Sequence, residues 1–141
     1  MVNLFTHLHP MVVHFPIALF VSALILELGS LLFKKENLHQ TAVVIYVLAT
    51  VIAPLVVWTG LEEAERVHLT HHPVLDLHRN FALLTMYSSL LSLPILFLLR
   101  KSKALRWIFL IQLLMVVSFV TLTAYNGGRM VYEYGVGIDA Q

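Results

Sequence analysis

Hydrophobic residues fill four long stretches of this chain, and short polar segments separate them. Three stretches contain no charged side chain: Gln40–Leu61, Asn80–Leu99 and Trp107–Gly128. The fourth, Pro10–Phe33, contains only Glu27. A helix needs about 20 apolar residues to cross a bilayer core of about 30 Å. The pattern therefore predicts membrane-spanning helices over residues 10–33, 40–61, 79–99 and 106–127.

The connections between these stretches are short, which favours helices that run antiparallel to their neighbours in sequence. We expect an all-α fold, an integral membrane antiparallel four-helix bundle that forms one domain over residues 1–141. The longest connection runs from Glu62 to His78. Loops of that length in compact domains are usually functional or locally ordered.

Basic residues are distributed unevenly between the two ends of the predicted bundle. Six lie in the first and third connections: Lys34, Lys35, Arg100, Lys101, Lys103 and Arg106. Only Arg66, Arg79 and Arg129 lie at the other end, mixed with acidic residues. Cytoplasmic loops carry an excess of Lys and Arg. The distribution predicts a multi-pass protein of a bacterial inner membrane with both termini outside.

Composition narrows the possible functions. The net charge of +1 and the lack of a basic aromatic face argue against nucleic-acid binding. The chain has no cysteine, which excludes c-type haem attachment, iron–sulfur clusters and disulfides. It has eight histidines, and seven of them fall at the outer end of the predicted bundle: His7, His9, His14, His68, His71, His72 and His78. Imidazole is a common ligand of haem iron, copper and zinc, so this clustering indicates a metal or cofactor site.

Two of these histidines, His14 and His78, fall at similar depth in spans one and three. In an up-down bundle these spans lie diagonally across the interior, so the two imidazoles could bind one haem iron as axial ligands. They could also bind a non-haem metal ion, cap helix ends or hydrogen-bond to each other. His9 precedes Pro10, which suits the first position of a helix, and is expected just outside that helix.

A second group, His68, His71 and His72, has the i, i+3, i+4 spacing of one helical face and could hold Zn or Cu. Thr70 and Pro73, however, indicate that the helix ends nearby. A polar loop without a metal is the alternative interpretation.

Glycines near the outer end of spans two and four, Gly60 and Gly127, indicate a close approach of a helix or a flat ligand. Arg129 follows closely and could bind a haem propionate through its guanidinium group. Deeper in the bundle, Glu27 falls at a depth comparable to Tyr46, Ser92 and Gln112. These four residues are expected to form a polar layer, with Glu27 hydrogen-bonded to Gln112 or Tyr46.

Several motifs together resemble an uncharacterised bacterial family of small four-helix membrane proteins, a domain of unknown function. The segment HPMVVHFPIAL at His9–Leu19 is similar to its N-terminal signature, and GGRMVYEYGVG at Gly127–Gly137 is similar to its C-terminal one. The resemblance covers nearly the whole chain and implies the fold and the membrane location. It also implies redox settings shared with cytochrome c modules, and it draws attention to His9, His14 and His78. Members often have histidine where this chain has Tyr134.

These observations lead to two functional hypotheses. In the first, the protein transfers electrons between quinol and an external carrier through haem b near the outer face, as a redox subunit rather than an enzyme on its own. His14 and His78 would be the iron ligands, and His9, Arg129, Gly60 and Gly127 would surround the haem. In the second, it is a non-catalytic accessory subunit of a larger membrane complex, and its histidines bind a metal ion or cap helices. The partners would be the lipid bilayer and, in the redox hypothesis, quinol, a c-type cytochrome or a respiratory complex.

Overall fold

A computed structural model describes residues 8–66, 73–98 and 104–136 of the chain. These residues form five helices and no strand: α1 (Leu8–Val12), α2 (His14–Phe33), α3 (Glu36–Arg66), α4 (Pro73–Leu98) and α5 (Leu105–Tyr132). Helices α1 and α2 are separated only at Val13 and together make one of four segments that are long and apolar enough to cross a membrane. The expected all-α four-helix fold is confirmed.

The helices extend beyond the apolar stretches that predicted them. Helix α3 begins at Glu36 rather than at residue 40, α4 begins at Pro73 rather than at 79, and α5 continues to Tyr132 rather than to 127. Hydropathy marks only the part of a helix that suits hydrocarbon, whereas backbone hydrogen bonding continues into the polar ends. Part of the long connection expected between Glu62 and His78 is therefore helical.

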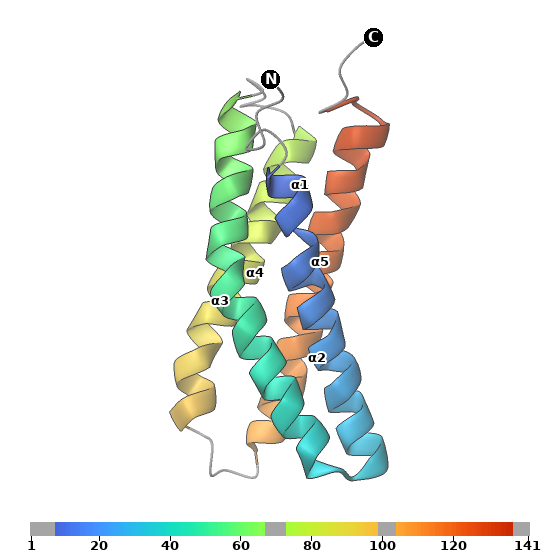
Figure 1. Cartoon of the computed structure of the whole chain (residues 1–141), viewed down its shortest axis with the longest axis vertical. Coiled ribbons are helices and arrows are strands. Elements are labelled where there is room, and N and C mark those ends of the chain that lie inside the picture. The colour runs from blue at the N-terminus through green and yellow to red at the C-terminus, as the bar shows by residue number, and fades with distance from the viewer. Residues whose placement is uncertain (1–7, 67–72, 99–103, 137–141) are drawn as a thin grey trace.

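The four long helices stand side by side in an up-down arrangement (Figure 1). Each of α2 and α4 packs against both α3 and α5, so α2 and α4 are diagonal to each other. The turn between α2 and α3 lies at one end of the bundle, here called the turn end (Figure 1). The start of α1, the ends of α3 and α5 and the start of α4 lie at the opposite end, here called the open end.

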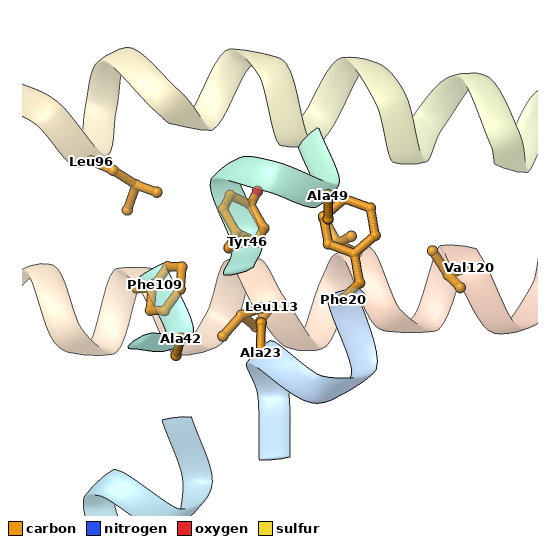
Figure 2. Close-up of a cluster of buried hydrophobic side chains, with 10 residues drawn as sticks. Phe20, Ala23, Ala42, Tyr46, Ala49, Leu96, Phe109, Leu113 and Val120 are labelled. Atoms are coloured by element: carbon orange, nitrogen blue, oxygen red, sulfur yellow. The ribbon is translucent and has the colours of Figure 1, made fainter. Parts of the chain in front are cut away.

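Large side chains fill the interior from the turn end to the middle of the bundle. Figure 2 shows Phe20, Tyr46 and Phe109 in this core, which contains residues from all four long helices. The ring of Tyr46 packs edge-on against Phe20 at 5.5 Å and against Phe109 at 5.4 Å between ring centroids. The interior at the open end is different. The described residues that line it are mainly histidine, alanine, valine and threonine rather than phenylalanine and tyrosine. A small cavity lies among these side chains.

A polar layer crosses the middle of the core. The Tyr46 hydroxyl is 2.7 Å from Ser92 Oγ, and Gln112 Nε2 donates to the Tyr46 hydroxyl and to the Ser88 carbonyl, both at 2.9 Å. These bonds link α3, α4 and α5, and they satisfy polar groups that hydrocarbon cannot solvate. Three of the four expected members of the layer are thus confirmed. Glu27 is buried as expected, but its contacts are with other residues, described below.

Candidate functional site

A small cavity lies inside the open end of the bundle. Its volume is about 60 Å³. All four spans line it: His9, Val13, Pro16 and Ile17 from the first, Ala53, Val56 and Val57 from α3, His78, Ala82 and Thr85 from α4, and Val120 and Thr123 from α5. Its lining is almost entirely apolar apart from the two imidazoles and two threonines, so the imidazoles are its chemically distinctive groups.

His9 reaches the cavity from α1 and is fixed against α3. Its Nδ1 lies 3.1 Å from the Val56 carbonyl and 3.2 Å from Thr59 Oγ1. The ring lies directly over Gly60, where an added Cβ would be only 2.8 Å from His9 Cε1. Any side chain at position 60 would therefore displace the ring. The glycine is what allows the imidazole to reach a carbonyl on the adjacent helix.

His78 is held in the same way by α5. Its Nδ1 lies 2.9 Å from the Thr123 carbonyl, and a Cβ at Gly127 would be 3.2 Å from both Cε1 and Nδ1 of the ring. In each case the carbonyl belongs to the residue four positions before the glycine, one helical turn away. The molecule uses one arrangement twice, in α1 with α3 and in α4 with α5.

The carbonyl contacts fix the tautomer of both rings. A carbonyl oxygen can only accept a hydrogen bond, so Nδ1 of each imidazole carries a proton and donates it. In the neutral ring the lone pair is then on Nε2, and no described residue hydrogen-bonds to Nε2 of either histidine. An Nδ1–H bound to a backbone carbonyl is the usual support for a histidine that binds metal through Nε2.

The two rings face each other across the interior. Their centroids are 6.3 Å apart and their planes are nearly perpendicular, at 87°. The first span and α4 are diagonal in the bundle, so the pair crosses its centre. The structure thus brings together two imidazoles at one depth, as the sequence predicted, but one member of the pair differs from the prediction.

The expected position of His14 is wrong. His14 is exposed, and its Nδ1 lies 2.9 Å from the Pro10 carbonyl, within the same span. Residues five apart on a helix point in directions that differ by about 140°. Because α1 already begins at Leu8, His9 lies within a helix rather than ahead of it and takes the inward direction. His14 is left on the outside.

Arg129 also lies away from the cavity. Its guanidinium contacts the carboxylate of Glu133, the residue that follows the end of α5, with an Nη2 to Oε2 distance of 2.9 Å, and lies 5.9 Å from the centre of the Tyr125 ring. It does not line the cavity. The i, i+4 spacing of Arg129 and Glu133 explains this, because such pairs meet on the helix surface.

The second predicted ligand group, His68, His71 and His72, lies outside the described residues. Within residues 8–66, 73–98 and 104–136, no group of three or more His, Cys, Asp or Glu side chains is placed to hold a metal ion. In this part of the chain, the donor set at the cavity consists of two imidazoles.

Sequence reasoning missed the repeated arrangement of histidine and glycine. Gly60 follows His9 by 51 positions and Gly127 follows His78 by 49, about the length of two spans and a turn. In an antiparallel pair of helices, this spacing places a histidine at the start of one helix beside a glycine at the end of the next helix. It was a usable signal for choosing His9 over His14.

Comparison with known proteins agrees with this architecture. A family model described as a predicted membrane protein (DUF2231) matches residues 6–140. No curated protein and no solved structure matches the chain. The match spans both histidine and glycine pairs and all four apolar helices, and on that ground the chain belongs to the DUF2231 family of membrane proteins.

Proposed function

We propose that the protein transfers electrons in a membrane and that His9 and His78 would hold haem b at the open end of the bundle. The observation that carries the proposal is the facing pair of imidazoles, each with its Nδ1 proton committed to a backbone carbonyl. Haem iron exchanges single electrons, and two axial imidazoles are a common way to hold it. Residues of this chain supply the ligands and set their orientation.

The number of ligands supports haem over an ion bound by protein alone. Structural zinc sites use four protein ligands and catalytic ones use three. The described residues provide two imidazole ligands at this cavity, His9 and His78. A haem brings most of the ligands of its iron with it, so His9 and His78 would be enough to hold it.

The closeness of the two rings supports a single site. Their centroids are 6.3 Å apart, so both imidazoles could contribute to holding one group.

The volume of the cavity sets a condition on the proposal. About 60 Å³ accommodates a few water molecules, whereas a porphyrin is far larger. Binding therefore requires the helices at the open end to separate. His9 stands on α1, a five-residue helix that is set off from α2 at Val13.

A second candidate function follows from the small volume of the cavity. Each imidazole packs against a glycine and hydrogen-bonds to a carbonyl of the neighbouring helix. His9 connects α1 to α3 in this way, and His78 connects α4 to α5. In that interpretation the histidines stabilise helix ends, and the protein is a non-catalytic accessory subunit of a larger membrane complex.

Sidedness and partners complete the proposal. The excess of basic residues at the turn end supports a bacterial inner-membrane protein with the open end and both termini outside. The haem would then lie near the outer face, where electrons could pass between quinol and an external carrier such as a c-type cytochrome.

An absorbance spectrum tests the proposal. The protein is expressed with ample haem, purified in detergent and reduced. We expect a low-spin spectrum with a split pair of visible bands. A protein that folds but remains colourless, and does not take up added haem, would contradict the haem proposal and favour the accessory-subunit function.

A further inference from the structure

A second polar cluster is buried near the turn end, away from the histidine cavity. Its centre is Glu27 on α2, which is completely buried. Charged side chains inside a membrane are costly and commonly belong to proton or ion pathways. The haem proposal does not use this cluster.

One oxygen of Glu27 has a short contact with a histidine. Glu27 Oε2 is 2.7 Å from Nδ1 of His39, near the start of α3. The His39 ring packs edge-on against Phe109, with centroids 5.7 Å apart, which holds it in place. The carboxyl and the imidazole are therefore positioned to exchange a proton without movement of either helix.

The other oxygen lacks a hydrogen bond. Glu27 Oε1 is 3.5 Å from Arg106 Nε on α5, and neither atom has a hydrogen-bond partner among the described residues. A carboxyl that served only to hold helices together would be expected to use both oxygens, because unsatisfied buried polar atoms are costly. Oε1 of Glu27 is therefore held only by the charge of Arg106, and Oε2 is the oxygen that meets a group able to donate a proton.

His39 connects this buried carboxyl to the surface. Its side chain is 12% exposed, whereas that of Glu27 is 0% exposed. With Nδ1 directed to Glu27, Nε2 is the ring nitrogen left to exchange protons with water at the turn end. An imidazole with one nitrogen on each side is suited to proton transfer at neutral pH.

We propose that Glu27 is a proton-binding site of the membrane interior and that His39 is the positioning residue through which protons reach it from the turn end. An O–H bond of a hydronium ion at the turn end breaks, its proton forms an Nε2–H bond on His39, and water is left. The Nδ1–H bond then breaks, and that proton forms an O–H bond with Glu27 Oε2. This leaves a neutral imidazole and a neutral carboxyl, and the reverse step returns the proton.

Other charged groups around the cluster keep it balanced. Arg106 faces Glu27 from α5 and lies 3.5 Å from Glu36 on α3, and its Nη2 donates to Ser30 Oγ on α2. Lys34 and Lys35 lie in the exposed turn. The described part of α4, Pro73–Leu98, has charged residues only in its first turns, at the open end. Loss of the carboxylate charge would therefore leave Arg106 paired with Glu36.

Infrared spectroscopy of the whole chain in lipid nanodiscs tests the site. Glutamate is labelled with ¹³C at its carboxyl group, and the carbonyl band of protonated carboxyl is followed after a downward pH jump. We expect a band from a buried carboxyl that Glu27→Gln removes. If Glu27→Gln does not fold, Glu27→Asp serves instead, since it removes the labelled group from position 27. A folded wild-type protein that shows no such band would overturn the proposal.

The role of His39 is tested by the rate at which the band appears. His39→Phe keeps an aromatic ring against Phe109 but cannot carry a proton. It should lower the rate at which the band appears by about tenfold or more. His14→Phe is the matched control, because it makes the same substitution at an exposed histidine near the open end. It should leave the rate unchanged. Equal rates in the wild type and in folded His39→Phe would show that protons do not pass through His39 and would overturn the relay.

Discussion

At the scale of single residues, the contact between glycine and histidine determines the site. Gly60 and Gly127 each leave room for an imidazole to reach a helix carbonyl. At Gly128, next to one of them, an added Cβ would meet no atom within 4 Å. The same residue type therefore has different roles at adjacent positions. Among the glycines that the structure describes, Gly60 and Gly127 are the two that lie under an imidazole ring.

Alanine substitutions test this difference. Gly60→Ala would place Cβ 2.8 Å from His9 Cε1, so the ring must move and its hydrogen bond to Val56 should break. We expect a loss of about 1–3 kcal/mol in the free energy of unfolding, the usual cost of a buried polar group left without its partner. Unfolding in mixed detergent micelles measures this change.

Gly128→Ala is the control for that experiment. Open space surrounds the position, so we expect unfolding to be unchanged or slightly less favourable, because alanine suits a helix better than glycine. An equal loss for Gly60→Ala and Gly128→Ala would show that the ring contact at Gly60 has no special importance.

The identity of the histidine pair shows how far sequence could lead at this scale. His78 and the depth of the site were predictable, because a histidine at the start of a diagonal span must lie near that end. The choice between His9 and His14 depended on whether the helix begins before or after Pro10. Proline is compatible with both, and hydropathy does not mark the first turn of a helix.

At the scale of helices, hydrogen bonds across the polar layer hold α3, α4 and α5 in register. Tyr46→Phe removes the hydroxyl that meets Ser92 and Gln112, but leaves Ser92 bonded to the Ser89 carbonyl and Gln112 to the Ser88 carbonyl. We expect a loss of about 0.5–1.5 kcal/mol in the free energy of unfolding, within the range measured for side-chain hydrogen bonds in membrane proteins.

Tyr87→Phe on α4 provides the matched comparison. Tyr87 is 55% exposed, so removal of its hydroxyl should not change the free energy of unfolding in the same detergent. A similar loss in both variants would mean that the layer at Tyr46 does not contribute to helix register.

The helices themselves were predictable because four apolar stretches of spanning length allow little else in a membrane. The partners of Glu27 were not. The distance of a residue from the helix end predicts its depth, and Glu27 was expected at the depth of Tyr46 and Gln112. Which residues meet depends also on the direction in which each side chain points around its helix axis. His39 lies just outside the predicted span 40–61 and Arg106 at the first residue of the predicted span 106–127, yet both lie in helices and both contact Glu27.

At the scale of the whole molecule, the bundle has two chemically different ends. The open end contains a cavity with two facing imidazoles, and the turn end contains a buried cluster of Glu27, His39 and Arg106. Large aromatic side chains and the Tyr46 layer separate them. Electron transfer and proton binding would therefore occur at opposite faces of the membrane in the proposed account.

Sidedness can be measured directly because the chain has no cysteine. Single cysteines are introduced at two exposed positions, Glu62→Cys at the open end and Lys35→Cys at the turn end. We expect a membrane-impermeant maleimide to label Glu62→Cys in intact cells and Lys35→Cys only after lysis, because basic residues favour the cytoplasm. Labelling of Lys35→Cys alone in intact cells would reverse the proposed orientation.

The central claim is that His9 and His78, rather than His14 and His78, bind the haem iron. The most direct test is the reduced absorbance spectrum of three purified variants, His9→Ala, His78→Ala and His14→Ala. The account predicts that the first two lose the low-spin spectrum or become high-spin, and that His14→Ala keeps the spectrum of the wild type. Loss of the low-spin spectrum in His14→Ala, with His9→Ala unaffected, would contradict it.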